Sequence, residues 1–134
     1  EMQAAILLEK LSLFPEELIS RNIIAKFYND NLPDILIGPL IPDGFLSSWA
    51  QFSILAETQL IRQEIMNKLN ESNIPSAIYY KLPLHLQKVF HYLNYKSSDF
   101  PVAEDISSRI FSIPMHPYLE RSDQNKILEV LHSI

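Results

Sequence analysis

The sequence predicts an α/β (α+β) fold, in which N-terminal helices are followed by a small sheet that contains a β-α-β unit and packs with further helices. Three patterns predict this class. Residues 4–11 and 19–27 place apolar side chains at helical spacing, and residues 47–56 alternate between two faces as a strand does. Residues 61–69 return to helical spacing and lead into a short apolar strand at 76–80, which completes the β-α-β unit.

A proline separates the two expected N-terminal helices. Pro15 breaks or kinks the path and reads as the start of a fresh helix. The buried stripe of the second helix is expected at Ile19, Ile23 and Phe27, and Leu18, Ile24 and Tyr28 broaden it. This helix should end by Leu32, because the proline that follows disfavours helical geometry in the residue before it.

The first half of the sheet region is marked by prolines and by one capped helix. Residues 35–42 contain two prolines and are expected to form an extended edge segment. Thr58 can cap the helix after the strand at 47–56. We expect the apolar stripe of this helix to face the core and its polar residues to lie outside; the stripe is Ile61, Ile65, Met66 and Leu69, and the outer residues are Arg62, Gln63, Lys68 and Asn70.

Shorter elements complete the chain. We expect a short helix at 86–92, a helix from Pro101 to about Ile110 that Asp99 can cap, and a short strand at 111–114. The last helix should begin at Ser122 or Asp123; its inward residues are expected to be Ile127, Leu128, Leu131 and Ile134.

Composition excludes several classes of function. With 134 residues, the chain is long enough for one domain with a core. A net charge of −5 argues against nucleic-acid and anionic-membrane partners, because both need a basic face. No apolar run approaches the ~20 residues of a membrane span, and there is no secretory signal. The absence of cysteine excludes disulfides and thiolate metal sites and fits a cytoplasmic protein.

Two histidines stand in stiff, proline-framed turns. His85 follows Pro83, and His116 lies between Pro114 and Pro117. An imidazole in such a loop can donate, accept or shuttle a proton, although each turn could equally cap a helix or fill a surface corner. His91 and His132 are expected at the surface, and the histidine spacing does not suit a metal site.

The other polar residues form no catalytic constellation. Glu104 and Asp105 are adjacent, so on a helix they point in different directions and are expected to be solvated or to stabilise the dipole. Tyr79 and Tyr80 alternate along the expected strand, so one should be core and the other exposed. Trp49 is expected in the core. An enzyme therefore cannot be derived from these residues alone.

Seven segments together resemble one known family in order and spacing. The family is DegT/DnrJ/EryC1/StrS, the pyridoxal-phosphate-dependent sugar aminotransferases. The resemblance covers nearly the whole chain, and the segments that carry it are residues 3–11, 21–28, 48–52, 74–80, 83–85, 100–104 and 112–119.

The resemblance implies the C-terminal small domain of a fold-type-I transferase. Residues 1–32 would be a helical linker from the large pyridoxal-phosphate domain, and residues 33–134 the small domain. The enzyme would be a homodimer that transfers an amino group, usually from glutamate, to a nucleotide-linked keto sugar, and this domain would close over the sugar. The resemblance implies His85 as the best substrate-pocket residue, with Tyr80 and His116 as weaker ones.

The lysine that binds the cofactor in this family has no counterpart here. It lies upstream of Gln3 in the family, and the seven lysines of this chain lack its context. The sequence also opens inside a helical pattern without an N-cap, which suggests a piece of a longer protein. We therefore expect this chain to be inert by itself and not to hold pyridoxal phosphate. Two alternatives stay open: a sugar dehydratase of the same family, and a stand-alone binding or dimerisation module.

Overall fold

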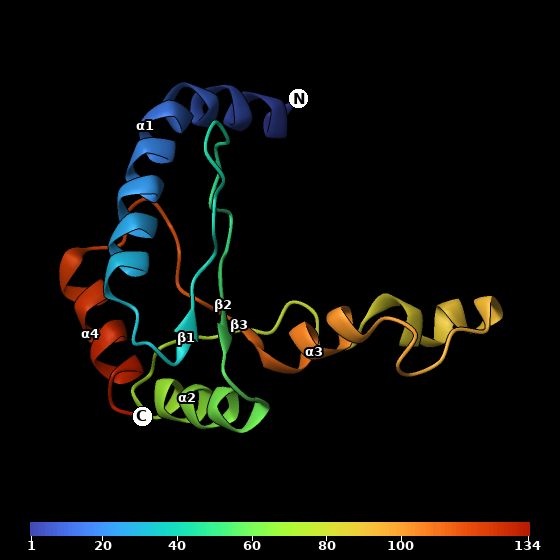
Figure 1. Ribbon diagram of the computed structural model, residues 1–134. Coiled ribbons are helices and arrows are strands. Elements are labelled where there is room, and N and C mark those ends of the chain that lie inside the picture. Colours follow the sequence, from blue (N-terminus) through green and yellow to red (C-terminus); the bar gives the residue numbers. More distant parts are fainter.

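The computed structural model describes residues 1–134 and combines a small antiparallel sheet with helices, which confirms the expected mixed fold class (Figure 1). Three α-helices and the sheet form the body, and a further helical segment projects from it. In chain order the elements are α1 (Met2–Asn31), β1 (Leu36–Ile37), β2 (Phe52–Ala56), α2 (Gln59–Glu71), the 3-10 helices η1 (Leu84–Leu86) and η2 (Lys88–Leu93), α3 (Pro101–Arg109), β3 (Ile110–Ile113) and α4 (Arg121–Leu131).

The sheet has the order β1-β2-β3, and both pairs are antiparallel. Phe52 lies opposite Ile113 in the register of β2 and β3, and Leu36 lies opposite Ala56 in that of β1 and β2. The strand predicted at 76–80 is reduced to a single bridge between Ala77 and Ser112. Ile78 still packs against the core, and from Tyr79 on the chain leaves the edge of the sheet and lines a groove outside the body.

The predicted strand at 47–56 is confirmed only in its second half. β2 begins at Phe52, and Trp49 has a φ of 49°, in the left-handed region that interrupts an extended run. Trp49 is nevertheless buried, as expected. Its indole N–H donates to Asn22 over 2.9 Å, and its carbonyl accepts from Arg21 over 2.9 Å, so two side chains of α1 hold this residue in place.

The core lies between the sheet and the helices α1, α2 and α4. Each contributes side chains from one stripe, and the inward residues of β2 and β3 meet them. The largest fully buried side chains are Tyr28, Phe52, Phe111, Ile54, Ile65, Leu69 and Leu131. One residue departs from the expectation for α2: Arg62, expected outside, is buried. Ile134, expected to face inward, is half-buried against the core.

The first element is one helix where two were expected. Pro15 lies inside α1, and the ribbon changes direction in this part of the helix, so the proline kinks the helix without ending it (Figure 1). The predicted buried stripe was wrong at Ile19 and Ile23, which are exposed, but Ile24 and Tyr28 at its border are buried and Phe27 is half-buried against the core. The buried residues of α1 are Ile24, Ala25 and Tyr28, because α1 has apolar residues on neighbouring faces and the sheet packs against only one of them.

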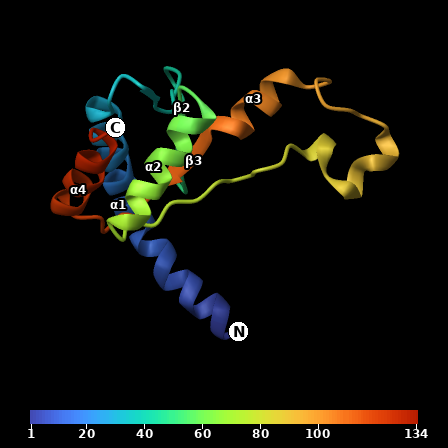
Figure 2. The same cartoon turned by 90° about the horizontal axis from the view of Figure 1, so that it is seen from below.

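An arm formed by residues 79–109 projects from the body (Figure 2). It carries η1, η2 and α3, and no residue from 86 to 110 is buried. The helix predicted at 86–92 is a pair of 3-10 helices, whereas the helix predicted from Pro101 is confirmed as α3. None of the helices has the length and apolarity of a membrane-spanning segment.

Candidate functional site

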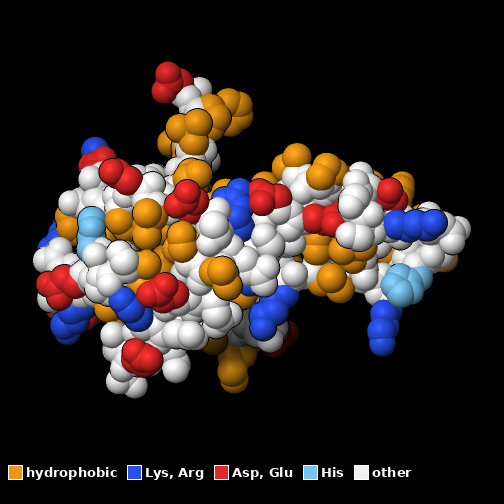
Figure 3. All heavy atoms as spheres, turned by 60° about the horizontal axis from the view of Figure 1, so that its bottom comes forward, with side chains coloured by type: hydrophobic (Ala, Val, Ile, Leu, Met, Phe, Trp, Pro, Cys, Tyr) orange, Lys and Arg blue, Asp and Glu red, His pale blue; other side chains and the backbone are white.

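The arm contains a groove with a volume of about 840 Å³. One wall is the turn that follows the sheet bridge, residues 79–87, and the other is α3 with the residues at its two ends. Most of the lining is apolar; it comprises Tyr79, Tyr80, Leu82, Pro83, Leu84, His85, Gln87, Phe100, Ala103, Ile106, Ser107 and Ile110. Apolar side chains also gather on the surface of the projecting arm in the space-filling view (Figure 3).

The turn that carries His85 is closed by hydrogen bonds of its own. The N–H of Leu86 donates to the carbonyl of Pro83, and the N–H of Gln87 donates to the carbonyl of Leu84, both over 3.0 Å. The Gln87 side chain reaches back to the carbonyl of Leu82 over 3.3 Å. The proline fixes its own φ, so the backbone presents His85 from a short and restrained segment.

The imidazole of His85 packs against α3. His85 is only 8% exposed, and the centroid of its imidazole ring lies 4.8 Å from the centroid of the Phe100 ring. Phe100 in turn meets Tyr95 edge to face at 5.0 Å. These aromatic contacts leave only a small part of the imidazole surface at the groove.

Glu104 binds the imidazole and the loop before α3 at once. Its Oε1 accepts from His85 Nε2 over 3.0 Å and from the Ser98 N–H over 2.8 Å, while its Oε2 accepts from the Ser97 hydroxyl over 3.0 Å. Desolvation opposes ionisation, but these hydrogen bonds together hold the pKa of Glu104 below its ordinary value. Glu104 is therefore a carboxylate at neutral pH and can only accept hydrogen bonds. This role was missed in the sequence, since no local pattern links a first-turn carboxylate to a histidine 19 residues earlier.

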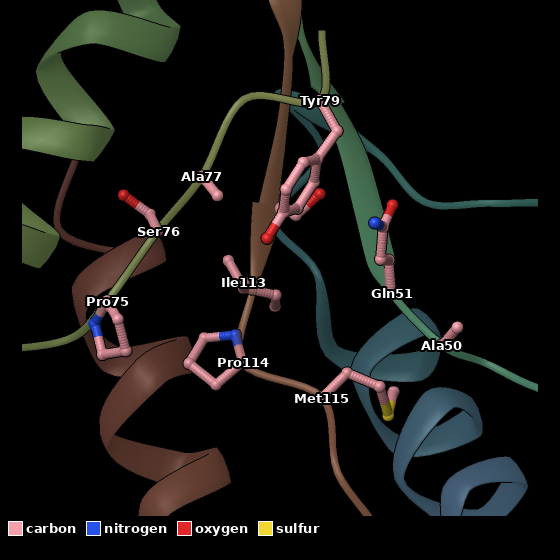
Figure 4. A pocket seen from close by; sticks show the side chains of 10 residues that line it. Ala50, Gln51, Pro75, Ser76, Ala77, Tyr79, Ile113, Pro114 and Met115 are labelled. Atoms are coloured by element: carbon pink, nitrogen blue, oxygen red, sulfur yellow. The ribbon is translucent and has the colours of Figure 1, made fainter.

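The two tyrosines border hollows on the arm and at its base. Tyr80 is 78% exposed in the large groove, and Tyr79 is 46% exposed, so the expectation that one of them belongs to the core was wrong. Tyr79 also borders a second pocket of about 220 Å³, where its ring extends over the space between Gln51 and Ser76 (Figure 4). The floor of this pocket is formed by Ile113 and the residues that follow β3.

The second histidine turn lies elsewhere. His116 is exposed and does not line the groove, so the two histidine turns do not face one pocket. Its loop is tied to α1, because the Tyr118 hydroxyl donates to Glu17 over 2.5 Å and Pro114 accepts from Tyr28 over 3.1 Å. The hydrogen bond from Tyr118, opposed in part by desolvation and helped by Lys10, lowers the pKa of Glu17.

The sequence model of the DegT/DnrJ/EryC1/StrS aminotransferase family matches residues 1–132. This chain therefore belongs to that family. A solved family structure from Brucella abortus is 44% identical to it with a TM-score of 0.88, and the match covers 98% of this chain and 34% of that one.

Two curated relatives carry nucleotide sugars in their names. One is the UDP-2-acetamido-2-deoxy-3-oxo-D-glucuronate aminotransferase of Pseudomonas aeruginosa, 32% identical over 89% of this chain and 32% of the relative. The other is the dTDP-3-amino-3,6-dideoxy-alpha-D-galactopyranose transaminase of Aneurinibacillus thermoaerophilus, 30% identical over 98% of this chain and 35% of the relative. The chain thus spans about a third of the length of the relatives it matches.

Pyridoxal phosphate is the cofactor of this family, but the residues of this chain do not fit its covalent attachment. A Schiff-base lysine must be desolvated beside the cofactor. Of the seven lysines here none is buried, and the least exposed, Lys68, donates to the carbonyl of Ser133 over 2.5 Å. There is also no group of three or more His, Cys, Asp or Glu side chains arranged to hold a metal ion.

Proposed function

We propose that the protein to which this chain belongs is an aminotransferase that moves an amino group, from glutamate, to a keto group on a nucleotide-linked sugar. The observation that carries this proposal is the family match over residues 1–132. The names of the two relatives, one a UDP sugar and one a dTDP sugar, support a nucleotide-linked substrate.

Within that enzyme this chain acts as the domain that closes over the sugar. We propose that residues 1–32 form the linker to the cofactor-binding domain and that residues 33–134 form the small domain. Tyr80 offers an exposed aromatic face to the apolar side of a sugar ring, and His85 offers a hydrogen-bonding atom beside it. His116 lies outside the groove, so we assign its loop a structural role.

The cofactor is held outside the 134 residues described. This chain by itself is then inactive and does not form a stable adduct with pyridoxal phosphate. The active enzyme is a homodimer with its site at the subunit interface. The many exposed apolar side chains on α1 and on the arm support burial of these surfaces in the intact assembly.

The test uses the intact natural gene product. Its visible spectrum is recorded, the protein is reduced with borohydride, and any pyridoxyl-lysine is located by peptide mass. We expect a coloured protein whose modified lysine lies outside residues 1–134. A colourless product with a mass close to that of this chain would instead support a binding module, and a coloured product whose modified lysine is one of the seven described here would contradict the assignment of the cofactor.

A second test addresses the groove. In the intact enzyme, Tyr80→Ala and His85→Gln should raise the KM for the sugar substrate, while the KM for the amino donor should stay the same. Lys88→Ala, a change at an exposed polar residue of η2 that does not line the groove, is the control. Unchanged sugar KM values in both groove variants would remove the groove from the substrate site.

A further inference from the structure

We propose that Glu104 is a positioning residue that fixes the imidazole of His85 with its proton on Nε2, so that Nδ1 serves as a hydrogen-bond acceptor for a hydroxyl or amino group of the ligand in the groove. The identity of that ligand as a sugar rests on the proposed function. The position of the proton rests only on the residues of this chain.

Several hydrogen-bond donors converge on Glu104. Three groups from two segments donate to its two oxygens: the His85 imidazole, and the Ser97 hydroxyl and Ser98 N–H of the loop before α3. A carboxylate that receives three hydrogen bonds is held in one orientation. The neighbouring Asp105 does not compete for these donors, because it forms an ion pair with Arg109 one turn further along α3.

The contact with Glu104 determines which nitrogen of a neutral imidazole carries the proton. An ionised carboxylate has no hydrogen to donate, so the 3.0 Å contact requires an N–H at His85 Nε2. In the neutral ring the other nitrogen then carries a lone pair. No group of this chain bonds Nδ1, and this atom is not sealed from solvent. The ring therefore keeps one free acceptor.

The plane of the imidazole ring is fixed by the same helix. Phe100 immediately precedes α3 and packs against the imidazole at 4.8 Å, while Glu104 lies in the first turn of that helix. One rigid element thus sets both the rotation of the ring and the location of its proton. A hydrogen bond from one ring nitrogen to a carboxylate commonly fixes the tautomer of a functional histidine.

The chemical consequence is selectivity for a donor. A neutral His85 fixed in this way accepts a hydrogen bond from a hydroxyl or an amine, and it offers nothing to a carbonyl or phosphate oxygen. An alternative is that Glu104 only ties the turn at 83–87 to α3. These two roles of Glu104 differ in what they require of Nδ1. A purely structural hydrogen bond through Nε2 does not require Nδ1 to be an acceptor, whereas the proposed positioning role does.

The direct test is ¹⁵N NMR of the histidine side chains in the intact protein, with the His85 signals identified by their loss in His85→Gln. We expect a pyrrole-type signal for Nε2 and a pyridine-type signal for Nδ1. In Glu104→Ala the two tautomers should mix, whereas in Glu104→Gln, whose amide oxygen still accepts from Nε2, the single tautomer should return. Asp105→Asn is the matched control and should leave the spectrum unchanged.

The proposal is overturned if the proton of wild-type His85 lies on Nδ1, or if both ring nitrogens carry a proton. Neither result needs a variant to fold. It is also overturned if Glu104→Ala folds and leaves the His85 signals as they are. All of these results concern only this chain.

Kinetics with the intact enzyme then separate this inference from the proposed function. His85→Gln keeps a donor near the Nε2 position but removes the acceptor, and His85→Asn keeps a polar group near Nδ1 but loses the tie to Glu104. We expect His85→Gln to raise the sugar KM by about three- to tenfold, the value of one lost hydrogen bond. If the tautomer is as expected and the KM does not change, the positioning by Glu104 stands and the assignment of the groove to the sugar fails.

Discussion

The hydroxyl of Tyr28 donates a hydrogen bond to the carbonyl of Pro114 over 3.1 Å, so a side chain buried in the middle of the core also fixes the loop after β3. The Tyr28 ring packs on Phe52 at 5.1 Å. Burial raises the pKa of this phenol, with a smaller contribution from Asp123, so its hydroxyl keeps its proton and acts as a donor at every physiological pH.

Removal of that hydroxyl tests the contribution of the bond. We expect Tyr28→Phe to lower the free energy of unfolding by about 1 kcal/mol, because the ring packing remains and one hydrogen bond is lost. Tyr28→Ala should cost about 3–5 kcal/mol, since it also leaves a cavity. Urea denaturation measures both. Tyr118→Phe, which removes an exposed hydroxyl that bonds Glu17, should have a smaller effect, and an equal loss in the two Tyr→Phe variants would contradict the special position of Tyr28.

A buried cation joins α2 to the base of the arm. Arg62 is 8% exposed and donates to the carbonyl of Ser107 over 3.0 Å. We expect Arg62→Ala to destabilise the chain by about 1.5–3 kcal/mol, the cost of losing a hydrogen bond from a charged donor together with the packing of its stem. Thermal unfolding measures the change. Gln63→Ala, the exposed neighbour on the same helix, should stay within about 0.5 kcal/mol, and equal shifts would contradict the role of Arg62.

The sequence predicted most elements because the signals for them are local. Thr58 caps α2 as expected, with the N–H of Ile61 donating to its hydroxyl over 3.2 Å, and α1 ends directly before Leu32. The errors arose where the local sequence is compatible with more than one buried face and the tertiary packing decides which face is buried. The predicted stripe of α1 spans two neighbouring apolar faces, and the packing buries Ile24 but leaves Ile19 and Ile23 exposed.

Local sequence patterns predicted only part of the candidate site. His85 and Tyr80 could be singled out because they flank a proline-set turn, and they line one groove. Glu104 could not, because it acts on a histidine 19 residues away along the chain, beyond any helical or strand period. The exposed arm adds a further difficulty, since its apolar residues resemble core residues in the sequence but form no core in this chain.

The hydrogen bonds of Glu104 predict a change in stability at acid pH. Its folded pKa lies below the ordinary value of 4.5, so its stabilising contribution is fully present above about pH 4.5 and is lost as the pH falls toward the folded pKa. We expect Glu104→Gln to lower stability at neutral pH and to flatten the loss of stability below pH 4.5. Urea denaturation over a pH series measures this.

The control for that series is an exposed carboxylate without an ion pair. Glu64→Gln on α2 should reproduce the pH profile of the unmodified chain. Glu17 and Asp105 also have lowered pKa values, and they remain in all three proteins, so the difference between the profiles reports Glu104 alone. Three parallel profiles would contradict the prediction.

The first half of α1 predicts self-association of the isolated 134-residue chain. Its exposed apolar residues include Leu7, Leu8 and Leu11, which are 66%, 69% and 66% exposed. Large bare apolar surfaces are uncommon on soluble monomers, because their burial between molecules is favourable. We expect sedimentation to show oligomers whose fraction grows with concentration. The double variant Leu7→Glu with Leu11→Glu should shift the chain toward monomer.

The matched variant adds the same charge without removing apolar surface. Gln3→Glu with Ser12→Glu changes two exposed polar residues of the same helix, so it should leave self-association nearly unchanged if the leucines carry it. If instead both double variants dissociate the oligomers equally, the added charge and not the loss of the leucines is the cause. A chain that sediments as a monomer at every concentration would contradict the prediction and would leave the apolar face of α1 as a surface that needs a different partner.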